Sequence, residues 1–169
     1  PPSEFTMTLR GTNPIVEMIV LIQLRVNQAS NNWYNFSRVG PAEGGRGNVE
    51  FNKPSGGKYW HQTKPNEHVL DPLEDLEVQI NGQVRWARAA APFLRTVPIQ
   101  RCHSRLPGLD KGAYMYNISH ALFPEEKHTG SGSIQSGRVE GIKIIGRLNP
   151  TLLTALDPAA SGIRVYVVV

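Results

Sequence analysis

Hydrophobic residues fall at every second position over residues 15–26, and several of them are β-branched. Alternate side chains of a β-strand point to opposite faces of its sheet, so this pattern predicts a strand with one buried face. The positions between them are half apolar, so we expect the second face to contact something as well. The residues on the buried face are Val16, Met18, Val20, Ile22, Leu24 and Val26.

A β-hairpin is predicted at Asn81-Gly82, a dipeptide typical of tight hairpin turns. A two-residue turn would place apolar residues of one strand opposite polar residues of the other. A three-residue loop over residues 81–83 keeps one face apolar, so we expect that loop, with Gly82 at positive φ. The expected pairs are Ile80 with Val84 and Val78 with Trp86.

Several other segments have strand-like alternation, and they are residues 4–10, 113–122, 139–148 and 163–169. The alanine-rich residues 85–95 could instead form a helical turn that Pro92 interrupts. A short helix is an option at residues 151–156.

Residues 27–72 are irregular and rich in loop-forming residues, which is typical of a long functional or interaction loop. Two short strands are expected within it, around residues 49–51 and 59–61. The chain then contains about eight strands at loop-separated intervals. That arrangement predicts an all-β, eight-stranded jelly-roll sandwich with long loops, folded as a single domain over residues 1–169.

The composition excludes several classes of protein. The 169 residues carry a net charge of only +4, and the arginines are scattered, so no specific nucleic-acid partner is expected. The single cysteine, Cys102, allows no intrachain disulfide, which suggests a reducing compartment. No segment is long and apolar enough to predict a membrane span. An apolar strand runs to the last residue, so we expect a fragment of a longer protein.

Two motifs could carry chemistry, but a structural role fits each of them better. Glu125-Glu126 could be an acid/base pair, yet adjacent loop carboxylates are usually solvated or contact a neighbouring subunit. The glycine-rich residues 130–137 lack the Lys-Ser/Thr of a phosphate-binding loop and the spacing of a nucleophile elbow. A turn that needs positive φ is the better interpretation.

No catalytic or metal centre is predicted. Cys102 and His103 are adjacent, whereas a catalytic thiol and imidazole are usually distant in sequence. His120 lies on an apolar face and is expected to be a satisfied core or interface residue. The histidines are scattered without metal-ligand spacing, so we expect no cofactor. They are His61, His68, His103, His120 and His128.

Sugars could contact the chain in two ways. Asn35 begins a sequon in a predicted loop and is a possible glycosylation site, while the sequon at Asn117 lies in a predicted strand. Aromatic residues in the loops could also stack on sugars, which makes a carbohydrate-binding jelly-roll module the alternative function. These aromatic residues are Trp33, Tyr34, Tyr59 and Trp60.

Residues 121–126, Ala-Leu-Phe-Pro-Glu-Glu, are followed by Ser131-Gly132 and by Arg-Val-Glu at residues 138–140. This order of short motifs resembles that of the major capsid proteins of nucleocytoplasmic large DNA viruses. Residues 80–86, 92–107 and 163–167 and Asn13-Pro14 resemble further family motifs in the same order. Gln135 and Gly137 stand where the family has Asn and Ser, and the Glu-Glu to Ser-Gly spacing is one residue longer.

The resemblance implies the C-terminal half of a double jelly roll, in a non-enzymatic subunit of an icosahedral capsid built from pseudo-hexagonal trimers. The implied partners are identical copies, neighbouring capsomers and minor capsid proteins, in a virion assembled in the host cytoplasm or nucleus. Interface elements are expected in residues 27–72, in residues 123–138 and on the polar face of residues 15–26. The signature residues are Pro124, Glu125, Glu126, Ser131, Gly132, Arg138, Asn81, Gly82 and Arg85.

Overall fold

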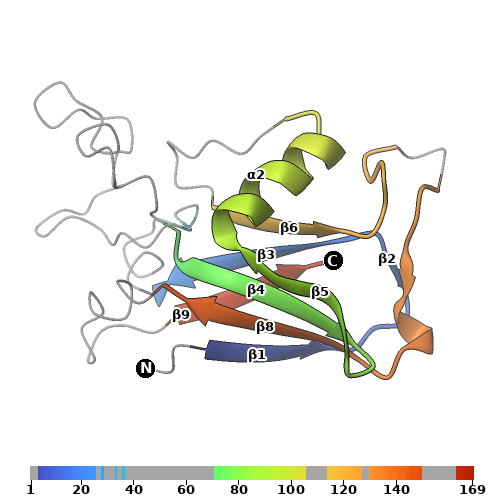
Figure 1. Ribbon diagram of the computed structural model, residues 1–169, viewed down its shortest axis with the longest axis horizontal. Helices are drawn as coiled ribbons and strands as arrows, with labels where there is room; N and C mark the ends of the chain where they lie inside the picture. Colours follow the sequence, from blue (N-terminus) through green and yellow to red (C-terminus); the bar gives the residue numbers. More distant parts are fainter. Residues whose placement is uncertain are drawn as a thin grey trace, which may run out of the picture.

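Two antiparallel β-sheets face each other across a shared apolar core, and one helix lies along their upper side in the view of Figure 1. The computed structural model describes residues 4–25, 28, 33, 36, 71–105, 114–126, 130–149 and 163–169. The predictions for Asn35, for short strands at 49–51 and 59–61, for a helix at 151–156 and for nearly all of the 27–72 loop concern residues outside these ranges.

The larger sheet has the strand order β1-β8-β4-β5, and the smaller sheet has the order β6-β3-β9. The first comprises β1 (Glu4–Leu9), β8 (Ile142–Leu148), β4 (Leu73–Ile80) and β5 (Gln83–Ala90). The second comprises β6 (Met115–Ser119), β3 (Glu17–Leu24) and β9 (Ile163–Val168). A short ribbon of β2 (Pro14–Ile15) and β7 (Ile134–Gln135) lies at one end, next to the 3₁₀ turn η3 (Ser136–Arg138).

The alternation predicted for residues 15–26 is confirmed where the structure describes it. The side chains of Met18, Val20, Ile22 and Leu24 are buried between the sheets. Val16 precedes β3 and is exposed, so its assignment to the buried face was wrong, and Val26 lies outside the described residues. The neighbouring strand β6 adds Tyr116 and Ile118 to this core, and β8 of the facing sheet adds Ile142, Ile144 and Leu148. Burial of this apolar area is the main force that stabilises the sandwich.

The hairpin connection is two residues long, not three. Ile80 pairs with Gln83, and Asn81 and Gly82 both have positive φ, 52° and 77°, as a type I′ turn requires. The predicted positive φ of Gly82 and the pair Val78–Trp86 are confirmed. The expected pair Ile80–Val84 is wrong, because Val84 pairs with Gln79 and Arg85 is then an extra residue that bulges from β5. The bulge in β5, rather than a longer turn, places Trp86 opposite Val78.

Residues 85–95 contain the end of a strand and the start of a helix. Strand β5 continues to Ala90, and helix α2 then runs over Ala91–Cys102. Pro92 lies in the first turn of α2 and begins the helix instead of interrupting it, because the N–H that proline lacks has no helical partner there. The strand predicted over residues 113–122 ends at Ser119, and Leu122 is exposed rather than buried.

Replacing Gly82 by alanine should destabilise the hairpin, because alanine adopts a left-handed conformation at a cost of about 1–2 kcal/mol. No atom lies within 4 Å of a Cβ built at Gly82, so the effect reports backbone conformation alone. Chemical denaturation should give a lower free energy of unfolding for Gly82→Ala. The control Gly82→Asn should lose less, because asparagine tolerates this region; equal losses for the two variants would contradict the turn assignment.

Candidate functional site

The Pro-Glu-Glu motif lies in a corner, residues 120–126, that leaves the end of strand β6. The backbone N–H of His120 donates to the carbonyl of Val16 at 2.9 Å, which fixes the start of the corner to the residue before β3. The Ser119 hydroxyl donates to the carbonyl of Ala121 at 2.7 Å and turns the chain away from the sheet. We call residues 120–126 the Pro-Glu-Glu corner.

Ser131 and Gly132 pack against this corner, as the order of the signature motifs suggested. The N–H of Phe123 donates to the Ser131 hydroxyl oxygen at 2.9 Å. Gly132 has a φ of +144°, and a Cβ at this position would lie 2.5 Å from the carbonyl oxygen of His120. Only glycine fits here, because a Cβ would clash with backbone and the conformation is unfavourable for other residues.

Glu125 binds the C-terminal end of α2. Its carboxylate accepts a hydrogen bond from the N–H of Ser104 at 3.1 Å, and Nδ1 of His103 lies 3.1 Å from its other oxygen. These two contacts, the Ser104 bond first, lower the pKa of the Glu125 carboxyl below its ordinary value. The first glutamate of the motif therefore fixes the residues that directly follow α2, and His103 among them lies 22 residues earlier in sequence.

His103 connects this corner to both neighbouring strands of the smaller sheet. Its Nε2 lies 2.9 Å from a carboxylate oxygen of Glu17 in β3, and the Asn117 amide of β6 donates to that oxygen at 3.3 Å. The hydrogen-bond partners of His103 among the described residues are two carboxylates and an amide. Such a cluster fixes geometry, and it brings no nucleophile to the imidazole.

A second polar cluster, which was not predicted from the sequence, fixes the N-terminal half of α2. Arg95 donates from Nε to both carboxylate oxygens of the fully buried Asp71, at 3.0 and 3.1 Å, and the Tyr116 hydroxyl donates to the same carboxylate at 3.0 Å. Burial, and then the charge of Asp71, raise the pKa of Tyr116 well above its ordinary value. The guanidinium of Arg95 also lies 5.7 Å from the centre of the Tyr114 ring.

The structure separates the signature residues into two groups. Asn81 is remote from the corner, and its side-chain oxygen accepts the N–H of Glu140 at 2.9 Å, so the hairpin turn packs on the residues before β8. Arg85 and Arg138 are exposed, and neither forms an ion pair with any residue that the structure describes. Glu126 is exposed and takes no part in the contacts of Glu125 with α2.

The departures from the family motif lie where the chain packs closely on itself. A Cβ on Gly137 would lie 3.2 Å from the carbonyl oxygen of Thr12, so this position has little room for a larger residue. Ser136, one position earlier, is buried, and its hydroxyl donates to the carbonyl of Asn13. The segment between the corner and β8 is thus fixed to the turn before β2.

The remaining candidates form no reactive centre among the described residues. No cluster of three metal-binding side chains occurs there, and no helix is long and apolar enough to span a membrane. Cys102 is a half-buried free thiol. Burial, followed by the charge of Arg85, lowers the pKa of His120, and its buried Nε2 has no hydrogen-bond partner among the described residues, so the expectation of a satisfied core histidine is not met there. His61, His68 and His128 lie outside the described residues.

The architecture is similar to that of solved viral capsid proteins. The PBCV-1 virus capsid model superposes with a TM-score of 0.54 at 15% identity, and it covers 97% of this chain and 43% of the capsid chain. The Faustovirus major capsid protein superposes with a TM-score of 0.57 at 12% identity, and it covers 97% of this chain and 31% of its own. The chain has the jelly-roll fold of these capsid proteins.

A third similar structure is PBCV-1 VP54 fitted into a cryo-EM reconstruction of the virophage Sputnik. It superposes with a TM-score of 0.54 at 15% identity, and the superposition covers 97% of this chain and 42% of that chain. The chain therefore spans less than half the length of each of these capsid proteins. No protein-family profile and no curated protein sequence matches it. The jelly-roll prediction and the resemblance to large DNA virus major capsid proteins are confirmed at the level of the fold.

Replacing Gly132 by alanine should destabilise the protein by roughly 1–3 kcal/mol, because a Cβ there clashes with backbone at an unfavourable φ. Gly130→Ala is the matched control, since no atom lies within 4 Å of its Cβ and its φ is not positive. Thermal or chemical unfolding should separate the two variants clearly. Equal stabilities would show that the close approach of Gly132 to His120 is not required.

The Glu125 contact should be sensitive to acid. Because folding lowers the pKa of Glu125, the stabilisation is complete above the pKa of the unfolded chain and is lost as the pH falls through the folded pKa. The difference in urea midpoint between wild type and Glu125→Gln should be largest near neutral pH and should shrink in acid. Glu126→Gln, which removes a neighbouring carboxylate but neither bond of Glu125, is the control; the same pH dependence in both variants would contradict the assignment.

Proposed function

We propose that this protein is a structural subunit of an icosahedral viral capsid. The observation that carries the proposal is the superposition of 97% of the chain on capsid proteins of different viruses. The contacts of the signature motifs add support, because each one that the structure describes fixes one element of the sandwich to another. A rigid jelly roll is the property that a repeated building block of a shell needs.

Assembly is the mechanism that this function requires. Identical subunits form homotrimers with a pseudo-hexagonal outline, and these trimers contact neighbouring capsomers and minor capsid proteins in the virion. The jelly roll described here corresponds to the C-terminal half of a double jelly roll. Many modest contacts, repeated by symmetry, then stabilise a shell, with assembly in the host cytoplasm or nucleus.

The other expectations stay proposals of lower rank. A role without catalysis agrees with the contacts of His103 and Glu125, which fix the end of α2. For carbohydrate binding, Trp33 is exposed, but Tyr34, Tyr59, Trp60 and the sequon residue Asn35 lie outside the described residues. No contact among the described residues favours a sugar ligand, so the capsid role remains the better proposal.

Native mass spectrometry and negative-stain microscopy of the full-length protein test this function. We expect species with three copies, or multiples of three, and regular assemblies at high protein concentration. A protein that stays monomeric under all conditions that support shell assembly, or one that binds glycans on an array, would contradict the proposal.

A further inference from the structure

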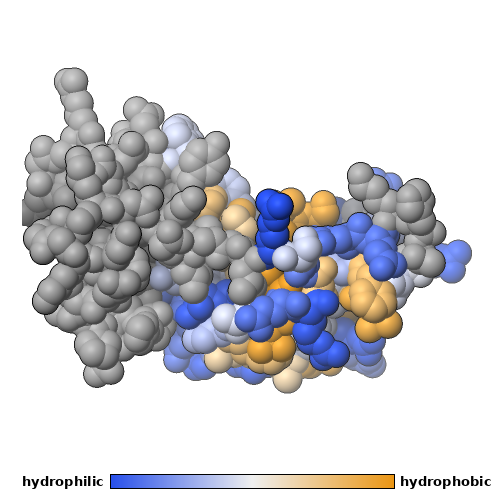
Figure 2. All heavy atoms as spheres, turned by 90° about the horizontal axis from the view of Figure 1, so that it is seen from above, coloured by the Kyte–Doolittle hydropathy of each residue, from blue (hydrophilic) through white to orange (hydrophobic). Residues whose placement is uncertain are grey.

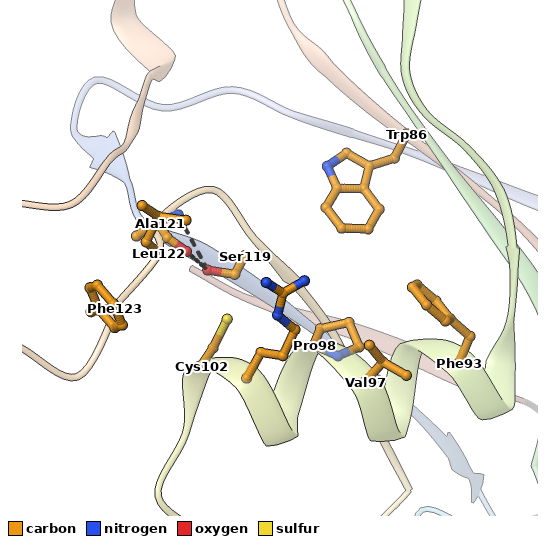
Figure 3. Close-up of a pocket in the computed structure, with 10 residues that line it drawn as sticks. Trp86, Phe93, Val97, Pro98, Cys102, Ser119, Ala121, Leu122 and Phe123 are labelled. Carbon is orange, nitrogen blue, oxygen red and sulfur yellow. Dashed lines mark hydrogen bonds between the residues drawn. The ribbon is translucent and has the colours of Figure 1, made fainter.

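An apolar groove lies between α2, β5 and the Pro-Glu-Glu corner. Its volume is about 350 Å³. In Figure 3, Val97 and Pro98 of α2 lie along one side, Trp86 lies across from them, and Leu122 and Phe123 lie toward the far end. We call these residues, together with Phe93, Arg101, Cys102, Ser119 and Ala121, the α2 groove.

Several large apolar side chains that line the groove are exposed to solvent. Leu122 is 69% exposed and Phe123 is 54% exposed, and Phe93 and Val97 are also exposed. These four are among the ten large hydrophobic residues that are exposed in the described part of the chain. Figure 2 shows hydrophobic atoms exposed between hydrophilic ones on the face seen from above. A concentration of this kind marks a surface that binds another apolar surface.

The groove and the Pro-Glu-Glu corner carry side chains of opposite charge. Arg101 is the charged residue among those that line it, it is exposed, and it forms no ion pair with any described residue. The corner has the opposite character, because exposed Leu122 and Phe123 are followed by exposed Glu125 and Glu126. The same chain thus carries an apolar groove with a basic side chain and an apolar lip with acidic side chains.

We propose that the α2 groove binds the Leu122–Glu126 lip of a second copy of this chain. Leu122 and Phe123 enter the groove beside Trp86, and Glu126 lies next to Arg101. Glu125 stays bound to His103 of its own chain, so the lip is already ordered before it binds, which reduces the entropic cost of association. This inference rests on the proposed capsid function, since it names one contact through which copies associate.

The contact is expected to be weak and reciprocal. Lip and groove adjoin on one surface, so a two-fold axis between two copies lets each lip fill the other groove. Ten residues line the groove, whereas a standard interface contains about 20–30 residues on each side. The contact therefore contributes little to an isolated pair and matters when a lattice repeats it.

Charge reversal tests the pairing. Arg101→Glu and Glu126→Lys should each weaken self-association about tenfold in sedimentation velocity, and the double variant should recover most of the loss, because the pair is then restored with opposite signs. Lys143→Glu, on an exposed position of β8 outside the groove, is the control for net charge and should change little. Circular dichroism confirms that each variant is folded.

A disulfide test locates the contact. One chain carries Phe123→Cys with Cys102→Ser, and its mass-tagged partner keeps the natural Cys102 in the groove. Mild oxidation should link the two chains through positions 123 and 102. A chain with Lys143→Cys and Cys102→Ser should not be linked to Cys102 above background.

Each result decides the proposal. If wild type assembles but the charge variants assemble equally well, or if no disulfide forms between positions 123 and 102, the groove contact is wrong while the capsid function stands. If both single variants weaken assembly and the double variant does not recover it, Arg101 and Glu126 do not pair with each other and the proposed seating of the lip in the groove is wrong. If wild type never associates, the capsid function fails together with the contact.

Discussion

Helix α2 is fixed at both of its ends by charged side chains, and most of the other features depend on this. The helix has little stability of its own, because no side chain caps its N-terminus, its first turn carries no acidic residue and Pro98 interrupts its hydrogen bonds. The ion pair of Arg95 with the buried Asp71 fixes the first half. His103, between the carboxylates of Glu17 and Glu125, fixes the other end.

The same anchors give the Pro-Glu-Glu motif its meaning. Glu125 accepts the N–H of Ser104 because the corner passes close to the end of α2, and Gly132 lies against His120, at the start of that corner, where a Cβ has no room. A carboxylate, a glycine and a histidine that are scattered in sequence therefore form one packed unit. The order of these residues along the chain is thus explained by their packing.

The alternation of apolar and polar residues predicted elements that are determined by their own sequence, such as the buried face of β3. It did not predict features that depend on contacts between residues far apart in the chain. The strand β5 absorbs an extra residue at Arg85, so the hairpin has a type I′ turn even though simple pairing disfavours it. Glu17 lies 86 residues from His103, and Asp71 lies 45 residues from Tyr116, separations over which no local sequence pattern indicates a contact. The sequence feature that could have indicated such a contact is Glu17, a glutamate in a mostly apolar strand, and in the structure this residue is half-buried.

In the Pro-Glu-Glu corner one carboxylate binds the end of α2, while the two large apolar side chains are exposed. Glu125 binds α2, whereas Leu122 and Phe123 face solvent beside the groove. A loop without a partner would gain stability by burying Leu122 and Phe123, since apolar side chains that stay exposed contribute nothing to folding. A corner that is fixed from within and apolar on its outside suits a surface that is completed by another subunit.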